Sequence, residues 1–206
     1  GRKIGMTQVY DEEGRRIPVT VLSVGPCVVV GVKPGPRDGY SALRIGYGEA
    51  RRKASKAALG VFKKAGVPAR SVLREIRLAS DDEASKYQAG QELTVGQVFE
   101  GVKRVSVIAN SKGRGFQGVI KRHHFHGGDS THGSMFHRRP GSIGSNTFPA
   151  RVFPGHRMAG RMGGGRISQK GLHVVAIEAE KGLMLVRGSV PGPLRGLVSV
   201  MEAAGS

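Results

Sequence analysis

Three glycines between residues 113 and 118 have a spacing that could hold a dinucleotide. The segment reads GRGFQG and follows a strand-like run, Val105 to Ala109, which matches the Gly-x-Gly-x-x-Gly turn of dinucleotide-binding proteins. Such a site also needs a helix after the third glycine and an acidic residue about 20 positions further on. The sequence predicts no helix after Gly118, and the acid position falls in HGSMFHRR, which contains no Asp or Glu. We therefore expect no nucleotide cofactor and no small-molecule substrate.

Six of the seven histidines lie between residues 123 and 156, where they could hold a metal or assist a nucleophile. His124 and His126 have a His-x-His spacing, but no His-Glu-x-x-His arrangement accompanies them and Asp129 is the nearby carboxylate. The serines of this region lack a Gly-x-Ser-x-Gly elbow, and paired carboxylates for acid–base chemistry are absent. We predict no catalytic residue and no metal site. An RNA-acting enzyme or metalloprotein that uses the His cluster is the alternative hypothesis.

Positive charge is concentrated in the middle of the chain. The sequence has 33 Lys and Arg against 15 Asp and Glu, a net charge of +18 and a pI near 10.9. Residues 103–170 hold 13 basic residues and one acid, or +12, together with five of the seven Phe. Phosphates attract cations and unpaired bases stack on flat rings, so this composition favours single-stranded or irregular RNA. The alternative is a solvated basic loop whose rings pack on the body of the protein.

Other partners and compartments are less consistent with the composition. The chain has no Trp and no apolar run near about 18 residues, which argues against a membrane partner. Cys27 is the only cysteine, so no disulfide can form within the chain. No charged-then-apolar leader opens the sequence. We therefore expect a cytoplasmic protein.

The flanking segments predict a mostly β fold. Short alternating runs, IGMTQVY, IPVTVLSV, CVVVGVK and SALRIGY, are separated by turn signals and predict antiparallel strands. Further strands are predicted for LTVGQVF, VKRVSVIA, LHVVAIEAE and GLMLVRGSV, whereas residues 49–78 favour helix. Residues 81–83 favour a helix start or a solvated turn over a catalytic carboxylate pair. Strands near both termini predict one closed β-barrel body with inserted helices.

Residues 122–165 follow neither the strand nor the helix period. They contain ten glycines and six arginines but no lysine. A loop this long is unusual unless it is functional or disordered. We therefore expect residues 1–121 and 166–206 to form the barrel body, with a helical insertion near 49–78, and residues 122–165 to form a long, irregular basic extension that is poorly ordered alone and takes its shape against a partner. A plain flexible linker is the alternative.

Five motifs resemble those of a known family. They are SKGRGFQGVIKR, HGSMFHRRPGSIG and RVFPGHRMAGRMG in the basic region, with GRKIGMTQVY and GLMLVRGSVPG near the ends. The sequence from Gly1 to about Val200 resembles the bacterial form of the universal large-subunit ribosomal protein three family. The resemblance implies a β-barrel body at the subunit surface, and an extension that passes through large-subunit rRNA toward the peptidyl transferase centre. It also implies rRNA binding early in assembly, neighbouring ribosomal proteins as partners, no enzymatic activity and no cofactor.

The motifs and the basic segment together supply the expected RNA contacts. These are Arg2, Lys3, Lys112, Arg114, Gly115, Lys121, Arg122, His123, His132, His137, Arg138, Arg139, Arg151, His156, Arg157, Arg161 and Arg166.

The chain departs from the family pattern at three places. The family usually has Asp where this chain has Ser106. Some bacterial members carry a methylated Gln where this chain has Ser145, so that modification is not expected here. The family starts a few residues earlier, with a Met, so we expect Gly1 to be a trimmed end.

Overall fold

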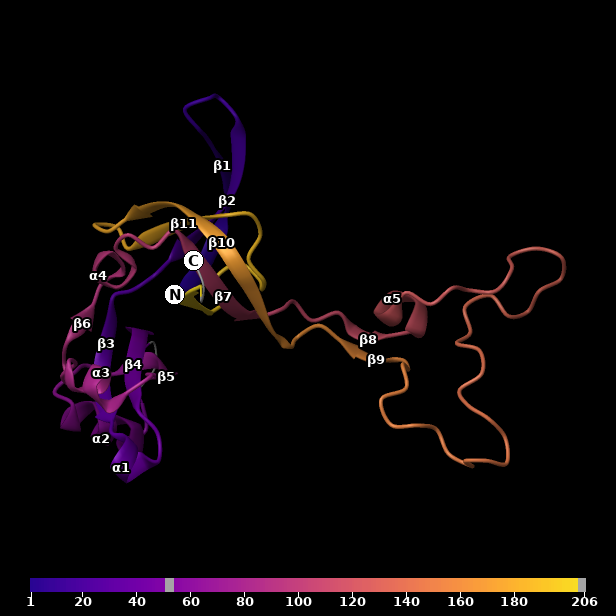
Figure 1. Cartoon of the computed structure of the whole chain (residues 1–206), viewed down its shortest axis with the longest axis horizontal. Coiled ribbons are helices and arrows are strands. Elements are labelled where there is room, and N and C mark those ends of the chain that lie inside the picture. Colours follow the sequence, from indigo (N-terminus) through magenta and orange to yellow (C-terminus); the bar gives the residue numbers. More distant parts are fainter. Residues whose placement is uncertain (51–53, 204–206) are drawn as a thin grey trace. The chain divides into compact units, whose positions relative to one another are not determined.

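The computed structural model describes residues 1–50 and 54–203, and most of its regular structure is β (Figure 1). The chain divides into two compact units: unit 1 contains residues 1–109 and 168–206, and unit 2 contains residues 110–167. Unit 2 thus includes the segment for which the basic extension is expected. In the described part of the chain, no helix has the length and apolar character needed to cross a bilayer.

A six-stranded sheet forms the larger part of unit 1. Its strand order is β1-β2-β11-β10-β7-β12. The bounds are β1 Arg2–Tyr10, β2 Arg16–Ser23, β7 Arg104–Asn110, β10 Arg166–Glu178, β11 Leu183–Arg187 and β12 Val198–Glu202. Alternating residues of β7 are buried, namely Val105, Val107 and Ala109, as expected for a strand with one face on a core. These side chains join Leu22 and Met184 in the main hydrophobic cluster.

The expectation of a closed barrel is wrong, because the sheet remains open between its two edge strands. β1 and β12 are the ends of the strand order and form no ladder with each other. The start of β1 is joined to the chain just before β12 by an isolated bridge between Arg2 and Leu197 and by backbone hydrogen bonds of Lys3 with Arg195 and Gly196. The chain that leads into β12 contains Pro191 and Pro193, which have no N–H to donate to a neighbouring strand. The fold class is therefore mostly β with an open sheet.

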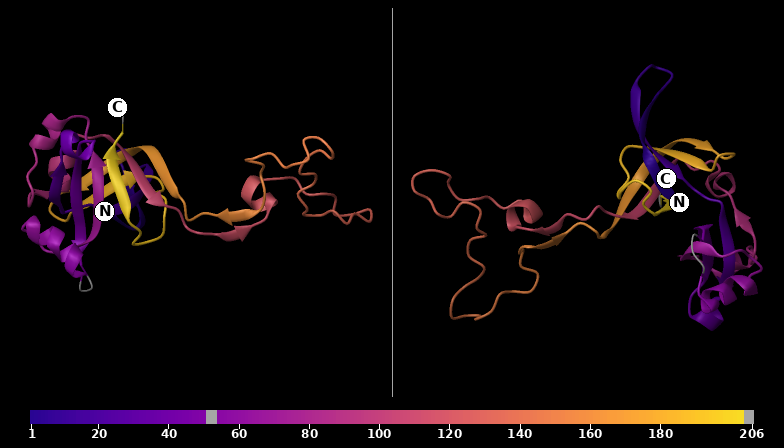
Figure 2. Two further views of the ribbon diagram at one scale, coloured as in Figure 1. Left: turned by 90° about the horizontal axis from the view of Figure 1, so that it is seen from below. Right: turned by 180° about the vertical axis from the view of Figure 1, so that it is seen from behind.

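A second, four-stranded sheet has the order β5-β4-β3-β6. Its strands are β3 Cys27–Lys33, β4 Ala42–Glu49, β5 Arg70–Arg77 and β6 Glu92–Leu93. The helices between them are α1 Gly35–Asp38, α2 Lys56–Lys64 and α3 Asp81–Ser85. Figure 2 shows α2 and this sheet in the same part of unit 1. α3 begins at Asp81 after a Ser80 cap, so of the two alternatives for residues 81–83 the helix start is the one observed.

Two secondary-structure expectations fail in part in this region. Helix was expected near residues 49–78, and α2 confirms it over Lys56–Lys64, while residues 51–53 lie outside the described residues. ARSVLREIRL instead contains β5, which pairs with β4 from Arg70↔Glu49 to Arg77↔Ala42. Pairing along a whole strand outweighs the weak helix preference of Arg and Leu. A strand was expected for LTVGQVF, but only Glu92–Leu93 is extended, and α4 follows over Val95–Phe99. Thr94 and Gln97 form a capping box that starts this helix.

One polar cluster joins three strands of the four-stranded sheet to the turn before β4. Glu75 accepts hydrogen bonds from the Tyr40 hydroxyl at 2.7 Å and from Arg44 Nη2 at 3.0 Å, and Lys33 Nζ lies 3.0 Å from its Oε1. Arg77 lies over the Tyr40 ring, 4.8 Å from the centroid. The hydroxyl of Tyr40, together with Lys33 and Arg44, lowers the pKa of Glu75 to about 2. The ionised carboxylate therefore links β3, β4 and β5.

We expect Glu75→Gln to lower the free energy of unfolding by about 1 kcal/mol or less at pH 7, the range of partly exposed ion pairs. Because the folded pKa of Glu75 lies below its ordinary value of 4.5, its stabilisation is present above that pH and is lost as pH falls toward 2. Urea unfolding from pH 7 to pH 2 measures the difference between the two proteins, which should shrink toward the acid end. Glu202→Gln is the control, since Glu202 is exposed and makes no ion pair in the described part of the chain. A difference that stays constant down to pH 2 would contradict the assignment.

Candidate nucleic-acid interface

The two ends of unit 2 are joined by a short antiparallel ladder. β8, Gly115–Gln117, pairs with β9, Gly160–Met162, with Phe116 opposite Arg161. The Arg114 amide donates to the Met162 carbonyl at 2.9 Å, and the Ser111 amide donates to the Gly165 carbonyl at the same distance. In Figure 1 these two chain segments run side by side through β8 and β9. We refer to residues 111–117 and 160–165 together as the neck.

Gly163 allows the two neck segments to approach closely, and Gly160 makes room for the Arg122 side chain. Gly163 has φ +71°, and a Cβ at this position would lie 2.1 Å from the Lys112 carbonyl oxygen. A Cβ on Gly160 would lie 2.5 Å from Arg122 Nη1. Any larger residue at Gly163 must both adopt the left-handed conformation and push back a backbone carbonyl. Glycine at position 163 is therefore required by the local packing of the neck, whereas nothing lies within 4 Å of a Cβ at Gly165.

A short helix follows the third glycine of the Gly-x-Gly-x-x-Gly segment, which corrects the expectation that none would be present. α5 spans Val119–His123 and ends at His124, which has φ +60°. This single turn differs from a dinucleotide site because β8 occupies the middle of the glycine segment, where the phosphate-binding turn would lie. The downstream acid is also absent, because HGSMFHRR contains no Asp or Glu.

α5 fastens the rest of the loop to the neck. Arg122 Nη1 donates to the Met158 carbonyl at 2.8 Å, and His123 Nε2 lies 3.1 Å from the same oxygen. Both side chains are half-buried. These two predicted RNA-binding residues therefore hold the returning chain, and Lys121 on the same helix is exposed.

Between His124 and Ala159, a stretch that the structure describes in full, the chain forms no helix or strand, but local contacts shape it. The Gly128 amide donates to the His137 carbonyl at 2.7 Å and closes a loop over residues 128–137. The Phe136 ring lies so close to Gly128 that a Cβ there would be 2.6 Å from the ring. The PGSIG block contains a second turn, in which Ser142 Oγ donates to the Gly144 carbonyl at 3.0 Å.

Most of the predicted contact residues in unit 2 present their side chains to solvent. Exposed members of the predicted set are Lys112, Arg114, Lys121, His132, His137, Arg138, Arg139, Arg151, His156, Arg157, Arg161 and Arg166, and the backbone of Gly115 is also exposed, with φ +72°. All six ion pairs of the described residues lie in unit 1. The cations of unit 2 are therefore not neutralised by carboxylates of the described chain.

Large apolar side chains of unit 2 are exposed as well. Phe148 is 88% exposed, Met135 85%, Phe116 77% and Phe153 61%. Among the described residues of unit 2, Val119 is the one buried hydrophobic side chain. The phenylalanines were singled out from the sequence, whereas the exposed Met135, Ile143 and Val152 were missed. A unit with this little buried apolar surface has rings and cations available to a partner.

The two predicted contacts near the start of the chain lie in unit 1. Lys3 is buried, and its Nζ donates to the Val190 carbonyl at 2.7 Å. A buried ammonium that is bonded to a backbone carbonyl does not fit a phosphate contact, so the interpretation of Lys3 as an RNA-binding residue is corrected to a structural role. Arg2 is half-buried at the bridge to Leu197.

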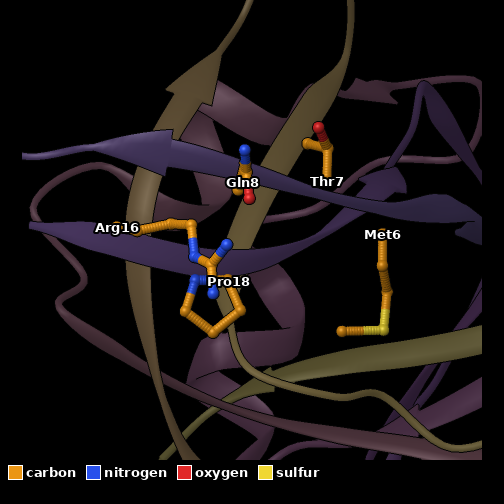
Figure 3. Close-up of a pocket in the computed structure, with 5 residues that line it drawn as sticks. All are labelled: Met6, Thr7, Gln8, Arg16 and Pro18. Atoms are coloured by element: carbon orange, nitrogen blue, oxygen red, sulfur yellow. The ribbon is translucent and has the colours of Figure 1, made fainter.

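Other candidate sites are weaker. Among residues 1–50 and 54–203, no group of three or more His, Cys, Asp or Glu is placed to hold a metal ion. A surface pocket of about 620 Å³ lies on the β1–β2 hairpin, lined by Met6, Thr7, Gln8, Arg16 and Pro18 (Figure 3). Arg16 is the only charged group in this lining, and none of the predicted contact residues contributes to it.

Comparison with known proteins gives matches along nearly the whole chain. The family model described as Ribosomal protein L3 matches residues 78–183. The large ribosomal subunit protein uL3 of Streptomyces coelicolor is 52% identical over 206 residues, which covers 99% of this chain and 94% of the relative. The proteins of the same name from Leifsonia xyli and Syntrophotalea carbinolica are 51% and 47% identical, with 98% of this chain covered in each case and 92% and 96% of the relatives.

We expect Gly163→Ala to loosen the neck while leaving unit 1 intact, because the new Cβ would meet the Lys112 carbonyl. Opening of the ladder should cost at least about 1.4 kcal/mol less than in the wild type, which makes exchange of the Arg114 and Ser111 amides at least tenfold faster. Hydrogen exchange read by mass spectrometry or NMR measures this. Gly113→Ala is the matched control, because nothing lies within 4 Å of its Cβ position. Equal exchange in both variants would show that the glycine is not needed for the neck.

Proposed function

Because the chain belongs to the ribosomal protein L3 family, we propose that it is a structural constituent of the large ribosomal subunit and that it binds large-subunit rRNA through unit 2. It acts in translation as a component of the cytoplasmic ribosome, without enzymatic activity. The observation that supports unit 2 as the binding part is its charge: its exposed cations have no carboxylate partner in the described chain. Neighbouring ribosomal proteins are further partners.

The side chains of unit 2 suit irregular RNA. Arginine presents a planar fork that pairs with phosphate or stacks on a base, and exposed rings such as Phe116 and Phe148 offer stacking surfaces to unpaired bases. We propose that the exposed cations and histidines of the predicted set make these contacts, with Arg122 and His123 positioning the loop at Met158. Gly115 permits close approach of a nucleic-acid strand to the backbone.

Binding also supplies the order that unit 2 lacks on its own. One buried hydrophobic residue cannot offset the conformational entropy of fixing 58 residues. We propose that residues 122–165 are the extension of the family, that they take a fixed shape against rRNA near the peptidyl transferase centre, and that binding occurs early in assembly.

We expect binding of the full chain to a large-subunit rRNA fragment to depend steeply on salt. Neutralising six to ten phosphates should lower the affinity by about 10³ to 10⁵ between 50 and 200 mM salt. In the variant R138Q/R139Q/R151Q, the slope of log K against log [salt] should fall by about 1 for each phosphate that the variant no longer neutralises. Filter binding or fluorescence anisotropy across a salt series measures both quantities.

The matched control is R138K/R139K/R151K, which keeps the charges but removes the guanidinium forks. It should retain the salt slope of the wild type and bind more weakly at every salt concentration. A flat salt response of the wild type would contradict the proposed function.

We expect trypsin to cut unit 2 quickly in the free protein and slowly in the assembled subunit. Arg138, Arg151 and Arg157 lie outside helices and strands and are exposed, so they should be cleaved first. Arg161 should be cut later because it lies in β9 opposite Phe116. Gel electrophoresis and mass spectrometry of timed digests identify the fragments, and unit 1 should survive as the resistant product. Equal resistance in both states would mean that unit 2 is ordered without RNA.

A further inference from the structure

A second concentration of positive charge lies in unit 1, between residues 50 and 77. These 28 residues contain nine Lys or Arg and one acid, Glu75, a net charge of +8. With residues 103–170 at +12, the remaining 110 residues have 11 basic and 13 acidic side chains, a net charge of −2. The net positive charge of the chain therefore comes from these two segments. Arg51, Arg52 and Lys53 belong to this count but lie outside the described residues, which contain the other six cations.

Five of these six cations are exposed. They are Lys56, Lys63 and Lys64 of α2, and Arg74 and Arg77 of β5. Within residues 1–50 and 54–203, none of the five makes an ion pair with a carboxylate. The sixth, Arg70, has a single long contact of 3.9 Å to Glu92. The acid of the segment, Glu75, is engaged by Lys33 and Arg44, which lie outside the segment.

Ordinary solvation does not explain a surface of one sign. β5 is an edge strand, and charged side chains on an edge strand discourage pairing with another chain. A few charges of either sign are enough for that purpose. A solvated helix gains from Glu–Lys pairs one turn apart, but the sequence of α2 contains no acidic residue. The uniform sign therefore indicates a partner of opposite charge.

We propose that α2 and β5 form a second RNA-binding surface, which contacts the phosphate backbone of double-stranded RNA. The exposed large hydrophobic residues of this region are the aliphatic Leu59, Val61 and Ile76, and the one phenylalanine, Phe62, is buried. The surface thus offers cations without the stacking rings that unpaired bases require. Duplex RNA is recognised through its phosphates and shape because its bases are stacked on each other. The α2–β5 surface and unit 2 therefore differ in the form of RNA that they bind.

Local contacts hold several of these cations in place before binding. The Arg77 guanidinium rests on the Tyr40 ring, and the Arg70 stem packs across Gly46, where a Cβ would lie 2.9 Å from the Arg70 Cγ. Ser55 caps α2 by accepting a hydrogen bond from the Ala58 amide at 3.3 Å, and Lys63 and Lys64 occupy the last turn of that helix. Side chains ordered in advance lose less entropy when phosphate binds.

The test compares the full chain with the variant K63Q/K64Q/R74Q on two RNA probes, a 20-base-pair duplex of arbitrary sequence and one of its strands alone. On the duplex, the slope of log K against log [salt] should fall by about 2 to 3, or about 1 for each phosphate that the variant no longer neutralises. On the single strand, the slope should stay as in the wild type. The matched control K86Q/K181Q/R187Q removes three exposed charges elsewhere on unit 1 and should leave both slopes unchanged.

The remaining outcomes separate this proposal from its competitors. An unchanged slope on the duplex, or an equal fall on both probes, would overturn it. If the variant binds both probes like the wild type but no longer joins reconstituted large subunits, the surface binds a neighbouring protein and the proposal is wrong. The charge-preserving variant K63R/K64R/R74K should restore the duplex slope, which excludes misfolding as the cause. The proposed function of unit 2 is tested independently by R138Q/R139Q/R151Q.

Discussion

Unit 2 is constrained by positive charge that no carboxylate of the described residues offsets. Every ion pair of the described residues lies in unit 1, so the cations of unit 2 repel one another without protein carboxylates to offset them. Burial does not supply the difference either, because Val119 is the only buried hydrophobic side chain that the structure describes in unit 2. A bound polyanion would offset this repulsion, which is what the proposed binding of rRNA by unit 2 supplies.

The neck limits how much chain a bound polyanion would have to order. Pairing of β8 with β9 brings residues 115 and 162 together, and α5 fixes a second point through the Met158 carbonyl. Each added constraint shortens the free segment, and the entropy of closing a loop grows only with the logarithm of its length. The further closure between Gly128 and His137 divides the loop again. Gly128, Gly160 and Gly163 make close contacts possible that a Cβ would obstruct.

Much of this organisation could be predicted from the sequence, and the failures have physical causes. The strands at residues 2–49 and 104–110 were predicted because their apolar residues alternate with the period of a strand. β5 was missed because Arg, Leu and Ala also favour helix, and its strand state depends on pairing with β4 along its whole length. The prediction of a closed barrel failed because closure depends on whether two edge strands that are distant in the sequence pair with each other. The local pattern of apolar and polar residues does not contain that information. For the candidate site, the charge pattern of the sequence identified the exposed cations. The burial of Lys3 and the hydrogen bond of Arg122 to Met158 could be recognised only from the structure.

The contrast between the two units has a consequence for the order of folding. Unit 1 has a core in which Leu22, Val105, Val107, Met184 and Val186 are fully buried, so it can fold from its own sequence before RNA is present. Under the proposed function, unit 2 becomes ordered when it binds RNA, and the entropy cost of that ordering lowers the affinity obtained per contact. A surface on unit 1 that binds RNA without reordering would form the first attachment, and it would raise the local concentration of RNA for unit 2. The distribution of charge into two segments, one on a stable sheet and one on a loop with little core, is therefore suited to attachment in two steps.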